Sequence, residues 1–359
     1  MARVHNFFPG PGALPLNVIK EVQAELEDFA GIGTSILECS HRTPQYEEVH
    51  NRATGLVREL LKMPENYHVM WLQGGASLQF TMLPMNRLGD GKTADYIDTG
   101  FWSTRAITEA KIVGDIRIAA GSKEDGYTYV PRDFEVNPEA QYLHYTSNNT
   151  IFGTQFFEPP NSGDVPLVAD MSSDVLWRFF DVTKYGMIYA GAHKNLGPSG
   201  ATLVIMRDDF LCKCKPGLPT LLCYDTHVKN NSMFNTPPTF TIYFISKVLQ
   251  QIKDKGGLDA MEAKNRKKAE LLYNFIDNSG GFFNCPIKVE DRSVMNAVFE
   301  MQTEELEATF IQEAIENGFI GLKNLPMRGH LRCSIYNSTE VESVVDLIDF
   351  MKDFMARKG

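Results

Sequence analysis

Short apolar runs separated by amphipathic segments constrain the fold of this chain more than any other feature of its sequence. The apolar runs have the length of buried strands and cover residues 69–72, 94–97, 141–145, 166–169, 187–192 and 201–206. Apolar residues at helical spacing predict helices over residues 18–29, 46–61, 239–252 and 258–278. Strands that alternate with helices are typical of an α/β protein with a mainly parallel sheet.

The pattern changes after the glycine pair at residues 256 and 257. Beyond it the sequence predicts two strands and a helix between them, at residues 294–301, 331–335 and 304–317, and then a C-terminal helix. We therefore predict a large domain over residues 16–256 and a smaller C-terminal α+β domain over residues 257–359. An irregular N-terminal arm, residues 1–15, is expected to join them.

Net charge and hydropathy limit the kinds of partner and the cellular location that we expect for this protein. The chain of 359 residues carries a net charge of −10, which disfavours nucleic acid and anionic membranes as partners. No apolar stretch approaches the roughly 18 residues that a membrane span requires, and the first residues lack an apolar signal segment. We therefore expect a cytoplasmic protein.

The six cysteines are scattered at positions 39, 212, 214, 223, 285 and 333. Cys212, Cys214 and Cys223 with His227 could supply zinc ligands, but their spacing matches no standard zinc motif. We expect free thiols and no metal site, because disulfides are uncommon in the cytosol.

Lys194 is the residue that points most directly to chemistry. It follows the apolar run 187–192 and precedes a loop of glycine, proline and serine, after which the run 201–206 returns to the core. A lysine held between two buried strands is unusual, and burial lowers the pKa of an amine, which suits it to forming a Schiff base. The alternative is a strand-end lysine that extends its amine to solvent.

Polar and aromatic side chains follow the neighbouring strands. Asp170 ends one apolar run, Trp102 and Thr150 follow two others, and a Gly-Gly turn precedes Ser77. These groups are expected in one crevice, since the carboxyl ends of parallel strands meet at one edge of a sheet. There a glycine turn can bind phosphate, a carboxylate can pair with a pyridine nitrogen, and an indole can stack on a ring. Taken singly, Asp170 could instead cap a helix and Trp102 could pack in the core.

The order of these signals resembles the fold-type I pyridoxal-phosphate enzymes, and within them the class V aminotransferases and their phosphoserine aminotransferase branch. The resemblance covers essentially the whole chain. It runs from the segment at residues 6–15 to the segment at residues 332–337, and its most specific motifs lie at residues 41–42, 73–80, 169–173, 189–198 and 235–237. It implies an α/β fold-type I transferase with a large, mainly parallel seven-stranded sheet, and pyridoxal 5′-phosphate as cofactor.

The resemblance also implies roles for individual residues. Lys194 would form the Schiff base with the cofactor and move the proton, and Asp170 would pair with the pyridine nitrogen. The other contacts to the cofactor from the same chain would come from Ala76, Ser77, Trp102, Thr150 and His193. Asn235 and Thr236 would reach the phosphate from a second subunit, which implies a homodimer with shared active sites.

Substrate binding requires at least two cationic pockets, because phosphoserine and glutamate each carry two anionic groups. By resemblance, Arg332 would bind the α-carboxylate, and His41 with Arg42 would bind the distal phosphate or carboxylate. The alternatives are a surface arginine on an edge strand and a solvated loop pair.

The chain departs from the family at one motif. Many members carry Gly-His-Arg where this chain reads Asn324-Leu325-Pro326. Arg328 and His330, a few residues further on, are the candidates for the missing charge. This difference affects how the substrate phosphate is bound and leaves the transamination chemistry unchanged.

The resemblance implies interconversion of 3-phosphohydroxypyruvate plus L-glutamate and O-phospho-L-serine plus 2-oxoglutarate by a ping-pong mechanism. Three alternatives stay open. One is another class V aminotransferase with alanine or serine as donor. Another is a cysteine desulfurase, for which Cys333 is poorly placed inside a predicted strand. The third is a non-catalytic homologue that has kept only the fold.

Overall fold

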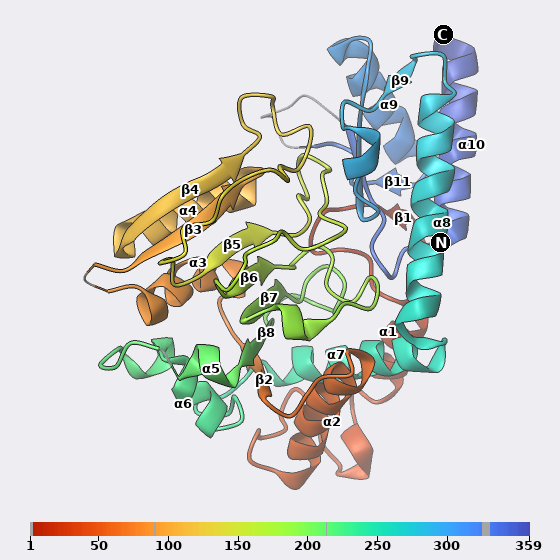
Figure 1. Ribbon diagram of the computed structural model, residues 1–359. Helices are drawn as coiled ribbons and strands as arrows, with labels where there is room; N and C mark the ends of the chain where they lie inside the picture. Colours follow the sequence, from red (N-terminus) through yellow and green to blue (C-terminus); the bar gives the residue numbers. More distant parts are fainter. Residues whose placement is uncertain (1–2, 90, 213, 325–330) are drawn as a thin grey trace.

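A seven-stranded sheet is the largest element of the computed structural model, which describes residues 3–89, 91–212, 214–324 and 331–359. Its order is β2-β8-β7-β6-β5-β3-β4 (Figure 1). The strands are β2 (Tyr67–Leu72), β3 (Thr93–Asp98), β4 (Asp115–Gly121), β5 (Leu143–Thr146), β6 (Leu167–Asp170), β7 (Met187–Gly191) and β8 (Thr202–Arg207). β8 runs antiparallel to β2 and β7, and the other neighbouring pairs are parallel. The predicted mainly parallel α/β sheet is therefore confirmed.

Apolar layers cover both faces of this sheet. The helices of this part are α1 (Leu16–Ala24), α2 (Pro44–Leu60), α3 (Gly75–Arg87), α4 (Phe101–Val113), α5 (Asp208–Leu211), α6 (Tyr224–Lys229) and α7 (Thr239–Asp254). Trp71 of β2 packs in the apolar cluster that includes α2 and α7, whereas its neighbours Met70 and Leu72 pack in the cluster that includes α3 and α4. Because side chains alternate across a strand and both faces are covered, the strands have nearly continuous apolar sequences.

The structure differs from the sequence prediction at β4 and at the end of α1, among other elements. No strand was predicted for β4, because this edge strand beside β3 is only partly buried. The helix predicted over residues 18–29 ends at Ala24, and Phe29 instead begins a short 3-10 turn, η1 (Phe29–Gly31), in which Ala30 takes a φ of 53°. Phe29 is nevertheless buried against Tyr243. Its apolar character therefore reflects burial and not a longer helix.

The C-terminal part has its own apolar core, built around Phe283, Phe299 and Phe310. Its elements are β9 (Phe283–Asn284), β10 (Asn296–Met301), β11 (Phe319–Ile320), β12 (Leu331–Ser334), α8 (Gly257–Asp277), α9 (Glu304–Glu316) and α10 (Val341–Lys358). β10 pairs antiparallel with β9 and β12. Further 3-10 turns along the chain are η2 (Val182–Lys184), η3 (Thr220–Leu222) and η4 (Val289–Asp291).

The N-terminal arm packs on the C-terminal part. Its strand β1 (His5–Asn6) pairs in parallel with β11, and Phe7 is buried in the C-terminal apolar core. The boundary between two domains at residues 256 and 257 remains a prediction, and the break between α7 and α8 lies at the same place. Among the described residues, no helix is long and apolar enough to span a membrane.

Candidate active site

A cavity of about 230 Å³ opens at the carboxyl ends of the parallel strands and the N-terminal ends of α3 and α4. It is lined by Gly75, Ala76, Ser77, Trp102, Thr146, Asn148, Thr150, Asp170, Ser172, Ser173, His193 and Lys194. All the residues that the sequence predicted for cofactor binding within one chain therefore meet around a single cavity. They come from segments far apart in the sequence because the parallel strands end at the same edge.

Lys194 follows β7 and is 5% exposed. Its Nζ donates a hydrogen bond of 2.6 Å to Thr150 Oγ1. Burial lowers the pKa of Lys194 to about 8, which Asp170 opposes and Arg332 reinforces. The amine thus lies inside the molecule, in contrast to the alternative of a solvated lysine at a strand end. Its unprotonated fraction near neutral pH exceeds that of an ordinary lysine.

Asp170 ends β6 and is buried. Its Oδ1 accepts a hydrogen bond of 2.9 Å from the backbone N–H of Ser172. Burial raises the pKa of the Asp170 carboxyl, whereas Ser172 and Lys194 oppose that shift. Irregular turns follow this residue, so it does not cap a helix. A buried carboxylate that lacks a full counter-ion favours a cationic ligand group beside it.

The first turn of α3 forms one wall of the cavity. Gly74 and Gly75 adopt φ values of 86° and 65°, and α3 begins at Gly75 without a side-chain cap. The first amides of such a helix point outward and bind anions such as phosphate. Ser77 adds a hydroxyl to the same wall.

Two polar atoms at the cavity lack a partner within the described residues. They are Nε1 of Trp102, in the first turn of α4, and Oγ1 of Thr146, at the end of β5. Buried polar atoms are normally hydrogen-bonded, so the cavity has the properties of a site for a polar ligand. An amine, a buried carboxylate, a helix start and an indole around one space fit pyridoxal phosphate.

His193 and the N-terminal arm close the cavity beside Lys194. Burial lowers the pKa of His193 to about 4, so its ring is neutral at physiological pH. Gly10 of the arm has a φ of 148°, and a Cβ at this position would lie 2.7 Å from Cδ2 of His193. The sequence analysis gave no role to Gly10. There it appeared only within the segment 6–15 of the resemblance and in the glycine- and proline-rich composition of the arm.

Arg332 lies in β12 and is 2% exposed. Its Nη1 donates to Asn324 Oδ1 at 2.7 Å and to the carbonyl oxygen of Thr150 at 3.4 Å, whereas its Nε has no partner among the described residues. The arginine is therefore not a surface residue, and its bond to Thr150 places it beside the cavity. Asn324, which replaces the glycine of the family motif, supplies its main hydrogen-bond acceptor. Leu325, Pro326, Arg328 and His330 lie outside the described residues.

The remaining predicted residues do not line this cavity. Arg42 is exposed, and His41 is half-buried with its pKa lowered by burial and by Arg42. Thr236 is exposed, with its carbonyl oxygen bonded to Gln73 Nε2 at 2.8 Å, and Asn235 is half-buried beside it. That these four residues contribute to the site of a partner subunit therefore stays a prediction.

Four further lining residues, Thr146, Asn148, Ser172 and Ser173, had no role assigned from the sequence. Their position in the sequence could have identified them, because each of them ends or closely follows β5 or β6.

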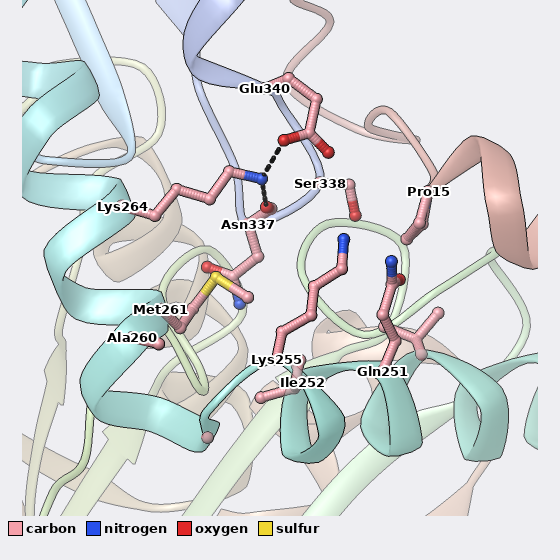
Figure 2. Close-up of a pocket in the computed structure, with 12 residues that line it drawn as sticks. Pro15, Gln251, Ile252, Lys255, Ala260, Met261, Lys264, Asn337, Ser338 and Glu340 are labelled. Carbon is pink, nitrogen blue, oxygen red and sulfur yellow. Dashed lines mark hydrogen bonds and ion pairs between the residues drawn. The ribbon is translucent and has the colours of Figure 1, made fainter.

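A separate cavity of about 250 Å³ lies between the end of α7, the start of α8 and the segment before α10 (Figure 2). Lys264 Nζ is 2.6 Å from Glu340 Oε2 and donates to the carbonyl oxygen of Asn337 at 3.2 Å there. None of the predicted functional residues lines it. Among the described residues, no cluster of His, Cys, Asp or Glu is placed to hold a metal ion.

Comparison with known proteins gives full-length matches. Residues 4–347 match the family model described as Aminotransferase class-V. The chain is 48% identical to the phosphoserine aminotransferase of Niallia circulans and 50% identical to that of Geobacillus kaustophilus, over 99% of each chain. It matches the solved phosphoserine aminotransferase from Bacillus circulans subsp. alkalophilus at 48% identity, with a TM-score of 0.98 over 99% of both chains. A pyridoxal-phosphate-bound phosphoserine aminotransferase from Trichomonas vaginalis matches at 36% identity with a TM-score of 0.92, over 98% of this chain and 100% of that one.

Proposed function

Because this chain belongs to the class-V aminotransferase family, we propose that the cavity between Lys194 and Asp170 is the active site of a pyridoxal-phosphate-dependent transaminase of serine biosynthesis. The enzyme interconverts 3-phosphohydroxypyruvate plus L-glutamate and O-phospho-L-serine plus 2-oxoglutarate, as its relatives of 48–50% identity imply. The observation that supports this site best is the pairing of a buried amine and a buried carboxylate across one cavity.

Different residues would hold different parts of the cofactor. The start of α3 with Ser77 would hold the phosphate, Trp102 would cover the ring, and Asp170 would pair with the ring nitrogen. Pyridoxal phosphate supplies an electron sink for the bonds at the substrate's α-carbon.

Lys194 moves the proton at that carbon. With its pKa lowered to about 8 by burial, its amine can both accept and return a proton near neutral pH. Thr150 orients the amine through the 2.6 Å bond. Arg332 binds the α-carboxylate of each substrate in turn, which sets the α-carbon against the amine.

The distal group is the basis of specificity in this proposal. His41 and Arg42 bind the substrate phosphate, and the exposed guanidinium of Arg42 has no side-chain partner in the described part of the chain. We expect these residues, with Asn235 and Thr236, to act in the site of a second subunit. The enzyme would then be a homodimer in the cytoplasm.

The test of the reaction is a donor comparison with purified protein, pyridoxal phosphate and 2-oxoglutarate. We expect kcat/KM to be highest for phosphoserine and at least about 100-fold lower for serine and alanine, because these donors lack the phosphate that would accept charge-assisted hydrogen bonds from Arg42. Equal values for serine or alanine would favour another class V aminotransferase. Arg42→Ala should reduce kcat/KM for phosphoserine more than for alanine.

Subunit sharing is tested by mixing inactive variants. Lys194→Ala and Arg42→Ala subunits are combined after mild unfolding and refolding. If Arg42 acts in the partner's site, each mixed dimer contains one intact site, so phosphoserine activity reappears. If Arg42 acts in its own subunit, the mixture gains no activity above the sum of the parent variants.

The alternative of a cysteine desulfurase lacks support from the geometry. Cys333 lies in β12 and is 0% exposed, and burial raises the pKa of its thiol. A catalytic cysteine of that kind must be mobile and readily ionised.

A further inference from the structure

A second buried carboxylate, Asp174, lies behind the active-site carboxylate Asp170. It sits in the turns after β6 and is 5% exposed. Its Oδ1 accepts a hydrogen bond from the hydroxyl of Ser147, and its Oδ2 accepts one of 3.1 Å from Gln155 Nε2. No Lys, Arg or His in the described ranges forms an ion pair with it. The carboxylate is thus held by two neutral donors, which is unusual for a buried charge.

Ser147 joins the carboxylate of Asp174 to the backbone of Asp170. Its Oγ lies 3.0 Å from the backbone carbonyl oxygen of Asp170, and its backbone N–H donates to the same oxygen at 3.0 Å. A hydroxyl has only one hydrogen to donate. An ionised Asp174 therefore takes the hydrogen bond of Ser147. A protonated Asp174 donates to Ser147 Oγ instead and releases the hydroxyl hydrogen for the carbonyl of Asp170.

Asp174 also borders a cavity of its own. This rear cavity has a volume of about 180 Å³, and its lining includes Tyr145, Ser147, Asp174, Arg178 and Tyr185. It shares no lining residue with the active-site cavity. Protons can therefore reach Asp174 without passing the substrate or the cofactor.

The charged and titratable groups that face Asp174 come from several elements. They are Asp170 at the end of β6, Lys194 after β7, Tyr145 of β5, Tyr185 before β7 and Arg178 in the turns. Burial raises the pKa of Asp174 to about 7, and the charge of Asp170 also raises this pKa. The hydrogen bonds from Ser147 and Gln155 and the charge of Arg178 lower it. In turn, the negative charge of Asp174 raises the pKa of Lys194.

We propose that Asp174 is a positioning residue of the transaminase, whose charge sets the protonation of the Lys194 site and whose proton exchanges through the rear cavity. This inference rests on the proposed function, because it assigns Lys194 to the cofactor. Between about pH 6 and 8, protonation of Asp174 removes one negative charge from beside Asp170 and Lys194. The protonated form of the lysine–cofactor group then becomes less stable.

The test is a pH titration of the visible absorption band of the holoenzyme. Asp174→Asn removes the charge and keeps the size of the side chain. We expect the midpoint to fall by about 0.5 pH unit or more, a threefold or larger change in the protonation equilibrium. The matched control is Glu158→Gln at the mouth of the same rear cavity, with a side chain 75% exposed. Solvent screens this charge, so its midpoint should equal that of the wild type.

An unchanged midpoint in a folded Asp174→Asn enzyme overturns the inference. Should that variant fail to fold, Ser147→Ala provides a second test, because it removes one of the two donors to Asp174 and keeps the carboxyl. Infrared difference spectra should then show the carboxyl titrating at higher pH than in the wild type, and the visible midpoint should again fall. Unchanged titrations in Ser147→Ala also overturn it. Failure of the proposed function differs from all these outcomes, since the wild type would then show no visible band with cofactor.

Discussion

The backbone N–H of Asn337 donates a hydrogen bond of 3.0 Å to Oδ1 of Asn195, the residue that follows Lys194. Asn195 Nδ2 donates to the carbonyl of Val175 at 2.9 Å, and both asparagines are buried. Asn337 follows β12, which carries Arg332. This amide pair therefore fixes the distance between the segment that carries the proposed α-carboxylate arginine and the one that carries the proposed catalytic amine.

Asn195→Ala should lower the free energy of unfolding by about 2 to 4 kcal/mol. The substitution leaves the Asn337 N–H and the Val175 carbonyl buried without partners, and each such group costs about 1 to 3 kcal/mol. Urea unfolding of the cofactor-free protein measures the change. The control is Asn230→Ala. Its exposed amide bonds to the Thr226 carbonyl, and the substitution should cost less than about 1 kcal/mol. Similar small losses in both variants would contradict the importance of the amide pair.

Burial of Lys194 gives a pH-dependent stability with a definite sign. Its pKa is about 8 in the folded protein against an ordinary value of 10.5. Between these values the unfolded chain binds more protons, so this group stabilises the folded state progressively as pH rises from about 8 to 10.5. Lys194→Met removes the buried amine. We expect the variant to exceed the wild type in unfolding free energy by a constant amount below pH 8, and by a shrinking amount above it.

Urea unfolding of both cofactor-free proteins at pH 7, 8, 9 and 10 checks this expectation. Lys255→Met, at an exposed lysine, is the control, because it makes the same substitution at an amine that solvent already surrounds. A pH-independent difference for Lys194→Met would show that the amine is not held at a lowered pKa.

Reductive trapping with borohydride should attach the cofactor to Lys194 alone. Lys268 is also buried, but its Nζ bonds to the carbonyls of Ile335 and Tyr336 and it lines no part of the active-site cavity. It serves as the internal control. Lys194→Ala should bind the cofactor reversibly, gain no mass on reduction, and lose about 10³-fold or more in kcat. Trapped cofactor on another lysine would contradict the assignment.

Trp102→Ala should weaken cofactor binding about 3- to 10-fold, because ring stacking contributes about 0.5 to 1.5 kcal/mol beyond the buried area. Trp102→Phe keeps a ring and removes only Nε1–H. It should bind within about threefold of the wild type if stacking dominates. Equilibrium titration of the cofactor-free protein gives both constants. Equal losses in the two variants would assign the main contribution to the indole N–H.

Asn324→Ala should raise KM for glutamate about 3- to 10-fold and leave cofactor affinity unchanged. It removes the 2.7 Å acceptor that orients the Arg332 guanidinium. Arg332→Lys should raise KM further, by about 100-fold, because an ammonium cannot form the two parallel bonds of a guanidinium. Steady-state kinetics with glutamate tests both. No change in KM for Asn324→Ala would show that Arg332 is oriented without it.

Much of the large sheet was predictable, because its strands are covered on both faces and so have apolar sequences that stand out along the chain. The edge strand β4 escaped prediction because one of its edges is unpaired and its side chains are only partly buried. The helix prediction extended too far because Phe29 falls at helical spacing from the residues before it. That spacing reflects burial, and Phe29 is buried in a 3-10 turn beyond the end of the helix.

Some residues of the active site could likewise be predicted from the sequence, and others could not. Lys194, Asp170 and Trp102 could be placed from the sequence because each follows a recognisable strand, and parallel strands end at one edge. Asn324 and Asp174 could not, because their importance depends on what packs against them. Asn324 becomes the acceptor for Arg332 because the preceding residue Lys323 pairs with Leu331 of β12, and Asp174 meets Ser147 beyond the ends of two strands.

The sequence by itself thus determined that a lysine would lie at the end of a buried strand, near a carboxylate and a phosphate-binding turn. Whether that lysine was solvated or buried was decided only by the tertiary structure. The arm at Gly10, the ring of His193 and the hydroxyl of Thr150 lie beside it. Burial, which lowers its pKa, is a property of all these segments together and of none of them alone.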